Sequence, residues 1–175
     1  MSTMTFHRPF DVHDWNRLPE GYPAQLIEGQ LVKDAPPVPR HQRLVGRLHL
    51  ALCRFVDEER VYLGPVGVVL DEHNAFQPDL AVIPRGRTIG PDEVSIGIPA
   101  LVVEVLSPST IAYDRGVKSR RYLGGGVDEV WLVDPDGRTI ETFSPSRSEV
   151  FEFGETATSQ AVPEIRIDLA GLFRV

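Results

Sequence analysis

The pattern of apolar and polar positions is clearest over residues 99–108, an apolar run that lies between two prolines. It is rich in valine and leucine, which predicts a β-strand covered on both faces. Side chains alternate between the faces of a strand, so Glu104 shares a face with Val102 and Leu106. A single carboxylate is therefore predicted inside an otherwise apolar strand.

Burial of an ionised carboxylate is unfavourable unless the group has a partner. Glu104 must consequently be paired, protonated or bound to a ligand. One interpretation is a structural ion pair with an arginine. The other is a functional site, because carboxylates with perturbed pKa values concentrate at such sites.

Two segments have apolar residues at helical spacing, about 41–58 and about 114–123. Three glycines follow the second segment and predict its end. Beside the apolar face of the first runs a narrow stripe of arginines: Arg40, Arg43, Arg47 and Arg54. These arginines either pair with the acidic residues 57–59 or contact phosphate groups beside an active site.

Shorter apolar segments predict further strands. A hairpin is expected over residues 25–32, where Glu28 is either a turn residue or a side chain directed inward. Two strands, 61–70 and 77–83, are predicted around a polar turn, with Asp79 at the start of the second. The remaining strands are expected at residues 127–133, 138–143, 143–153 and 164–168.

The composition limits the function classes. One domain over residues 1–175 is expected, since the length suits one core and no repeat appears. A net charge of −7 argues against a protein that coats nucleic acid through bulk charge, although a local basic patch remains open. No apolar run has the roughly 18 residues of a membrane helix. Cys53 is the single cysteine and no secretory signal is recognised, so a cytoplasmic protein is expected.

Asp79 and Glu104 lie on consecutive predicted strands, an arrangement that can bring two carboxylates to one place. Oxygen ligands of this kind suit Mg²⁺ or Mn²⁺, and Glu28 could supply a third if its hairpin lies alongside. Such a metal can generate hydroxide from water and neutralise charge on a phosphoryl oxygen. The histidines do not have the spacing of a zinc site and are expected at the surface or in helix packing: His41, His49 and His73.

Pro78-Asp79 followed by Glu104-Val105-Leu106 resembles a degenerate PD-(D/E)XK nuclease motif. Further motifs in the right order over about residues 24–143 resemble the Uma family of proposed restriction endonucleases: Leu26 to Gly29, Val103 to Ser109, Asp114 to Lys118 and Trp131 to Pro135. The resemblance implies a restriction-endonuclease-like α/β fold of the mixed α+β kind, a mixed central sheet flanked by helices. It also implies DNA as the partner.

The lysine of that motif stands two residues after the glutamate, where this chain has Leu106. A nuclease of this class needs a cation near the attacking water and the scissile phosphate. The resemblance implies that Lys118, on the following helix, takes this place. The chain has 16 arginines and only one other lysine, Lys33. The alternative is a surface lysine that pairs with Asp114.

Two functions from different classes follow. In the first, the protein is a metal-dependent endonuclease that hydrolyses DNA phosphodiester bonds: Asp79 and Glu104 bind the metal, Lys118 orients water or phosphate, and Glu28 joins the catalytic set. In the second, the fold binds without cutting, as a regulatory module. A homodimer is expected because duplex cutting by a small nuclease takes two copies and the C-terminal strands offer edges for pairing.

Overall fold

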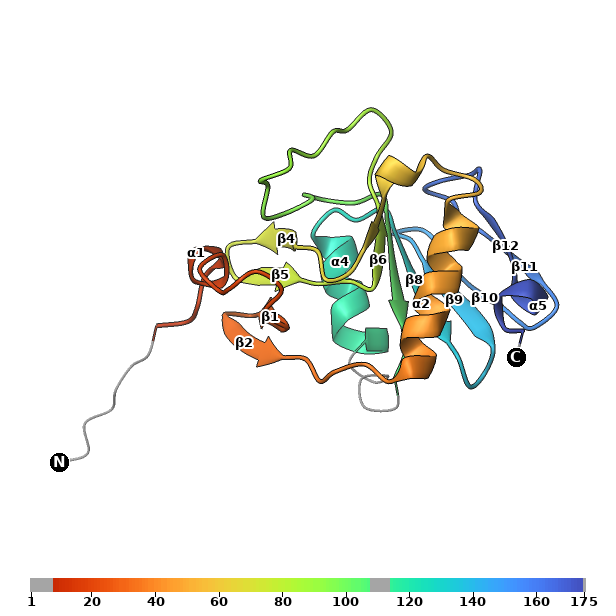
Figure 1. Ribbon diagram of the computed structural model, residues 1–175, viewed down its shortest axis with the longest axis horizontal. Helices are drawn as coiled ribbons and strands as arrows, with labels where there is room; N and C mark the ends of the chain where they lie inside the picture. The colour runs from red at the N-terminus through yellow and green to blue at the C-terminus, as the bar shows by residue number, and fades with distance from the viewer. Residues whose placement is uncertain (1–7, 108–113, 175) are drawn as a thin grey trace.

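The computed structural model describes residues 8–107 and 114–174, and its central element is a six-stranded mixed sheet (Figure 1). The strand order is β10-β9-β8-β7-β6-β3, and β7 and β8 form its parallel pair. The strands of this sheet are β3 (Val61–Leu63), β6 (Leu80–Val82), β7 (Leu101–Val105), β8 (Glu129–Asp134), β9 (Thr139–Phe143) and β10 (Ser148–Phe151).

Two smaller sheets accompany the central one. A four-stranded sheet has the order β2-β1-β5-β4, and a two-stranded sheet joins β11 and β12. Their strands are β1 (Ala24–Ile27), β2 (Gln30–Lys33), β4 (Val68–Asp71), β5 (Asn74–Phe76), β11 (Thr156–Thr158) and β12 (Arg166–Asp168). The hairpin predicted over residues 25–32 is confirmed as β1 and β2.

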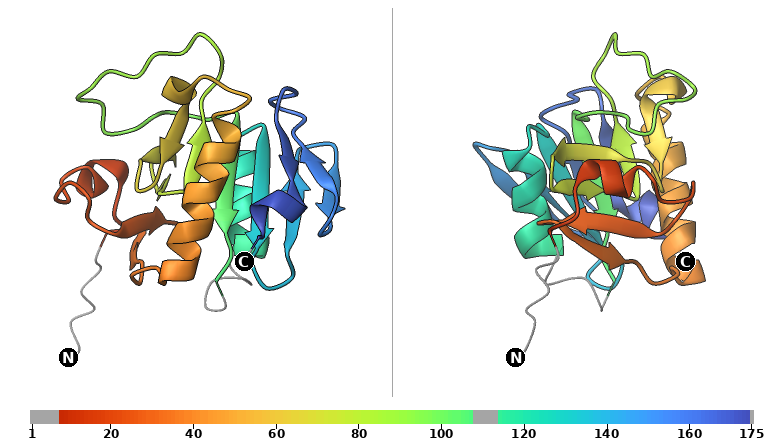
Figure 2. Two further views of the ribbon diagram at one scale, coloured as in Figure 1. Left: turned by 45° about the vertical axis from the view of Figure 1, so that its right-hand side comes forward. Right: turned by 90° about the vertical axis from the view of Figure 1, so that its left-hand side faces the viewer.

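Helices cover both faces of the central sheet. The α-helices and single turns are α1 (Val12–Trp15), α2 (Pro39–Leu52), η1 (Glu58–Arg60), η2 (Asp114–Lys118), α4 (Ser119–Gly124) and α5 (Leu169–Leu172). α2 and α4 lie on opposite faces of the sheet, as the second view of Figure 2 shows. The predicted mixed sheet flanked by helices is therefore confirmed. Within the described ranges, none of these helices is long and apolar enough to cross a bilayer.

β7 is the buried strand that the sequence predicted, and all five of its residues are buried. Its odd positions, among them Val103 and Val105, pack in the core cluster beneath α2. Val102 on the other face packs with Tyr122 of α4. The sheet thus separates two apolar layers, and Glu104 lies in the layer that α4 covers.

The predicted strand over residues 61–70 is wrong, because the chain passes from one sheet to another within it. β3 ends at Leu63 and β4 begins at Val68 in the four-stranded sheet. Between them, a side chain on Gly64 would place its Cβ 2.3 Å from the carbonyl oxygen of Pro78. This close approach requires glycine, and it fixes the segment next to Asp79.

α2 is shorter than predicted and ends at Leu52 instead of near residue 58. Its buried face is the predicted one, with Leu44, Leu48 and Leu52 in the core. After the helix the chain turns, so that Val56 packs in the same cluster. The segment from 58 to 60 forms the separate turn η1.

The C-terminal segment is attached to the central sheet through the buried carboxylate of Glu129, which is 1% exposed. Its Oε2 accepts hydrogen bonds from the backbone N–H groups of Gln160 and Ala161, at 2.9 and 3.0 Å, and from the hydroxyl of Ser159. Its Oε1 accepts one from Trp131 Nε1 at 3.0 Å. β11 and β12, predicted as part of the edge strands, pair with each other instead.

Candidate functional site

Glu104 is buried, as predicted, with 5% of its surface exposed. Its Oε1 lies 2.7 Å from Nζ of Lys118 and accepts a hydrogen bond of 2.8 Å from the hydroxyl of Tyr122. The interpretation of a structural pair with an arginine is therefore wrong, because the cation on Glu104 is a lysine. Together the ammonium and the phenol stabilise a carboxylate that would otherwise be costly to bury.

The chain segment after β7 brings both partners to Glu104. Lys118 ends η2 and Tyr122 lies in α4, four residues further on, so the two side chains share one helical face. Tyr122 is fully buried and its ring packs against Phe76 at a centroid distance of 5.1 Å. Lys118 is 5% exposed, so the alternative of a surface lysine is wrong. The side chain of Asp114, its suggested partner, lies outside the described residues.

Asp79 directly precedes β6, and β6 pairs with β7 as expected. In this antiparallel pair Leu80 lies opposite Val103, which places Asp79 beside Glu104 at the next position. Oδ2 of Asp79 accepts a hydrogen bond of 2.8 Å from the backbone N–H of Val105. The two predicted carboxylates therefore meet at the carboxyl end of β7.

His41 also belongs to this site, although the sequence predicted a surface or packing residue. From the first turns of α2, its Nε2 lies 3.2 Å from Oδ2 of Asp79 and 3.1 Å from the carbonyl oxygen of Val105. Both neighbours are acceptors, so Nε2 carries a proton. The Asp79 carboxylate raises the pKa of His41 above its ordinary value, although burial of the ring opposes this shift. At neutral pH this favours a cationic imidazole beside Asp79.

Glu28 has contacts elsewhere. It occupies the β1–β2 turn with a positive φ of 49°, and 59% of its side chain is exposed. Its Oε1 is paired with Arg121 of α4, and its backbone N–H donates to Asn74. Of the two interpretations, the turn residue is the one observed. Its membership of the catalytic set stays a prediction that these contacts do not support.

The donor set at the end of β7 fits a hard divalent cation in its chemistry. The carboxylates of Asp79 and Glu104 and the carbonyl of Val105 are all oxygen ligands, which Mg²⁺ and Mn²⁺ prefer. Two of these oxygens contact His41 Nε2, so a cation must displace the imidazole to use them. In the part of the chain that the structure describes, no cluster of three or more His, Cys, Asp or Glu side chains is suited to hold a metal ion.

In the metal-free protein, His41 is expected to stabilise the fold more at acidic than at alkaline pH. Because its pKa is raised on folding, this stabilisation is complete below the unfolded pKa of about 6.5 and is lost as the pH rises through the folded pKa. Urea unfolding of the wild type and of His41→Gln at a series of pH values would measure it. The difference in unfolding free energy should shrink with rising pH, and a constant difference would contradict the prediction.

The fold is the restriction-endonuclease-like one, a mixed sheet with a carboxylate-bearing central strand. It superimposes on the crystal structure of a "putative nuclease belonging to DUF820" from Anabaena variabilis with a TM-score of 0.80 and 22% identity, over 94% of this chain and 98% of that one. Residues 11–170 match the Uma2 family, described as "Putative restriction endonuclease". The chain belongs to this family, as the sequence motifs predicted.

A relative from Synechocystis sp. is 34% identical over 103 residues and is described as an uncharacterized protein. The match covers 56% of this chain and 53% of the relative, so the chain spans about half of that protein's length.

Proposed function

We propose that this protein is a metal-dependent endonuclease that hydrolyses phosphodiester bonds in DNA. The observation that carries the proposal is the buried pair of Lys118 Nζ and Glu104 Oε1, 2.7 Å apart, beside Asp79 at the end of β7. The description of the family and the printed name of the Anabaena protein support a nuclease.

In this proposal Asp79 and Glu104 bind Mg²⁺ or Mn²⁺, with the Val105 carbonyl beside them. The bound ion would activate water and neutralise charge on a phosphoryl oxygen. Lys118 carries three donors on a compact ammonium and orients the water or a phosphate oxygen. Tyr122 is a positioning residue, because its hydroxyl fixes Oε1 of Glu104.

A second candidate is a nuclease fold that binds DNA or a regulatory partner without cutting. One observation favours it: both carboxylates already have cationic neighbours, Lys118 at Glu104 and His41 at Asp79. A cation that enters the site has to compete with the imidazole for Asp79. The metal concentration needed for activity therefore bears on the choice between the two functions.

Incubation of supercoiled plasmid with Mn²⁺ tests the proposal. The wild type should nick the plasmid only when the metal is present, and Glu104→Gln should be inactive. Glu152→Gln, a change at an exposed position, should cut like the wild type. Calorimetry should show Mn²⁺ binding by the wild type and much weaker binding by Glu104→Ala. Equal binding by the two would exclude the metal site, and a wild type that binds Mn²⁺ without cutting would favour the second candidate.

We also propose that the protein acts in the cytoplasm as a homodimer. β10 is a free edge of the central sheet, and near it Val150 and Phe153 are 59% and 48% exposed. Edge pairing between two copies would cover these apolar side chains. Light scattering at micromolar concentration should give the mass of a dimer, and Val150→Lys should give a monomer. A monomeric wild type would refute the proposal.

A further inference from the structure

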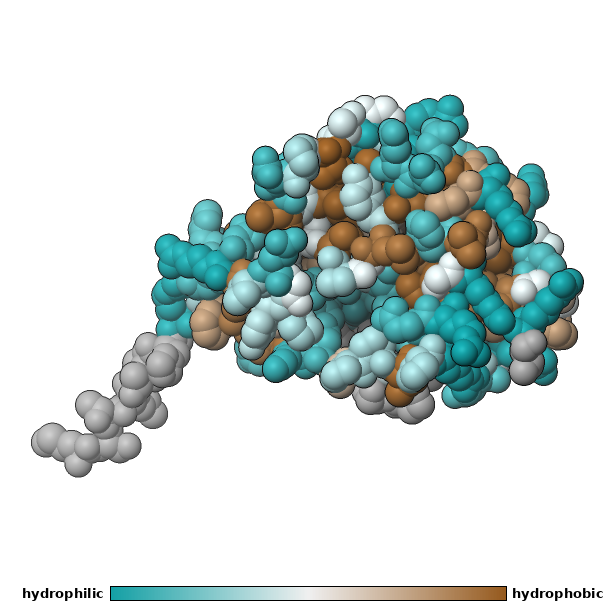
Figure 3. All heavy atoms as spheres, in the orientation of Figure 1, coloured by the Kyte–Doolittle hydropathy of each residue, from teal (hydrophilic) through white to brown (hydrophobic). Residues whose placement is uncertain are grey.

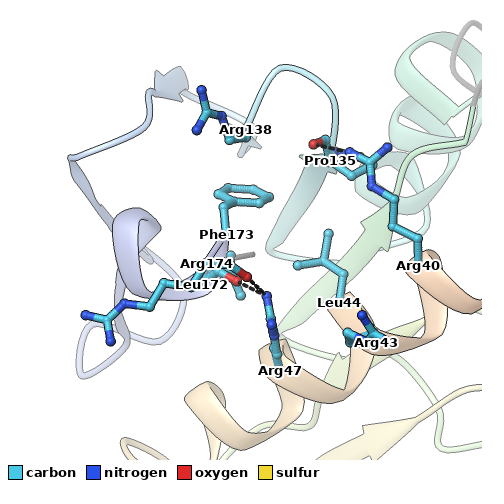
Figure 4. Close-up of a pocket in the computed structure, with 9 residues that line it drawn as sticks. All are labelled: Arg40, Arg43, Leu44, Arg47, Pro135, Arg138, Leu172, Phe173 and Arg174. Carbon is cyan, nitrogen blue, oxygen red and sulfur yellow. Dashed lines mark hydrogen bonds between the residues drawn. The ribbon is translucent and has the colours of Figure 1, made fainter.

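A hollow of about 340 Å³ lies between α2, the turn from β8 to β9 and the C-terminal segment (Figure 4). Its volume is at the lower end of the range for ligand pockets, about 300–1,000 Å³. Five of the nine residues that line it are arginines: Arg40, Arg43, Arg47, Arg138 and Arg174. The lining contains no acidic residue. In a chain with a net charge of −7, this is a pronounced local concentration of positive charge.

Two of these arginines hold the walls of the hollow together. Arg40 donates to Oδ1 of Asp136 at 2.7 Å and to the carbonyl of Pro135 at 2.6 Å. Arg47 donates to the carbonyls of Leu172 and Arg174. The predicted pairing of the arginine stripe with residues 57–59 is therefore wrong for both. Their contacts instead fix the β8–β9 turn and the C-terminal segment against α2.

The other three arginines have no ionic partner among the described residues. No carboxylate lies within ion-pair distance of Arg43, Arg138 or Arg174 there, and Arg138 is stacked on the ring of Phe153 at 4.3 Å. In Figure 4, Phe173 lies in the middle of the hollow, between Arg138 on one side and Arg47 on the other. Guanidinium groups gathered in this way repel each other, and an anion between them would relieve the repulsion.

The hollow is adjacent to the Asp79 and Glu104 site. Arg40 and His41 are consecutive in α2, and His41 contacts Asp79 while Arg40 contacts the residues that follow β8. Because β7 and β8 are parallel, their carboxyl ends lie at one edge of the sheet. The surface over the N-terminal end of α2 is strongly hydrophilic (Figures 1 and 3). A chain of phosphates can therefore continue from the site to the hollow.

We propose that this hollow binds backbone phosphates of the nucleic acid, next to the bond that is cut; the inference rests on the proposed function. From Arg40 to Arg47 the helix rises about 10 Å, which corresponds to about three phosphates of one strand. Guanidinium groups bind phosphate oxygens through paired hydrogen bonds. These contacts are independent of base sequence, so the hollow sets the position of the substrate and not its recognition sequence.

Fluorescence anisotropy of a short labelled duplex, without divalent metal and over a range of salt concentrations, tests the inference. The wild type is compared with Arg43→Gln/Arg138→Gln, which removes two charges that have no ionic partner. The double variant should bind about tenfold to a hundredfold more weakly at low salt, and its slope of log K against log salt should be smaller by about 1.8. Arg17→Gln/Arg166→Gln, changed at two exposed positions outside the hollow, should bind like the wild type.

The outcomes separate this inference from the proposed function. Wild-type affinity and slope in Arg43→Gln/Arg138→Gln would overturn the inference, even if the protein cuts DNA. Wild-type binding without cleavage, weakened in the double variant, would support the hollow and refute the endonuclease. If the wild type binds no duplex, calorimetry with inorganic triphosphate decides. Binding that the double variant loses would assign the hollow to a free phosphate ligand, and no binding would overturn the inference.

Discussion

Lys118→Met is expected to abolish plasmid cleavage while Mn²⁺ binding stays within a few-fold of the wild type. Lys118 contacts Glu104 and is proposed to act on water and phosphate, whereas the metal is proposed to bind the carboxylates. Methionine keeps most of the buried aliphatic volume and removes the charge. Loss of a positioned cation at a phosphoryl-transfer site costs about 10²-fold or more in rate. Cleavage and calorimetric titration on the same preparations measure the two effects.

Removal of one partner of a buried ion pair also destabilises the fold, by about 3–5 kcal/mol. Glu104→Gln/Lys118→Met removes both charges and should recover much of this stability without recovering activity. Lys33→Met, at the one other lysine, should leave cleavage unchanged. Cleavage by Lys118→Met at the wild-type rate would refute the role proposed for this lysine.

Glu129→Ala is expected to lower the free energy of unfolding by about 3–5 kcal/mol and the melting temperature by about 10 °C. The change would leave two backbone N–H groups, the indole N–H of Trp131 and the hydroxyl of Ser159 without their acceptor. Each unsatisfied buried donor costs about 1–3 kcal/mol, and water that enters the space offsets part of the sum. Thermal and urea unfolding measure the loss.

Two further variants bracket that effect. Ser159→Ala removes one of the donors and should cost about 1 kcal/mol. Glu152→Ala, on the exposed surface, should stay within about 0.5 kcal/mol of the wild type. If Glu129→Ala were as stable as the wild type, the carboxylate would not be what attaches the C-terminal segment to the sheet.

The sequence predicted the parts of the fold that follow from local pattern. β7 was recognised because an apolar run between prolines has the composition of a central strand, and the structure buries all its residues. The glycines at 124–126 marked the end of α4 correctly. The strand predicted over 61–70 was wrong because Gly64 approaches Pro78, a contact between segments that periodicity does not report.

The candidate site shows the same division. Asp79 and Glu104 were placed on adjacent strands because they lie on consecutive apolar segments, and the structure pairs those segments. His41 was missed because its contacts are with Asp79 and Val105, which are distant in the sequence. The helical spacing of Lys118 and Tyr122 was visible, but the tyrosine was not recognised as a partner of Glu104. A lone histidine early in a helix carries no signal of its own.

The position of Lys118 on the connection between β7 and β8, instead of on β7 itself, changes what controls the geometry of the pair. Two residues apart on one strand, a glutamate and a lysine have a separation set by the pleat of the backbone. Here the separation depends on how η2 and α4 dock against the sheet. Helical segments at an edge can open locally at lower free energy than a central strand. The ammonium and the carboxylate can therefore part by undocking of one short segment while the sheet stays folded, so hydrogen exchange in α4 reports on assembly of the site.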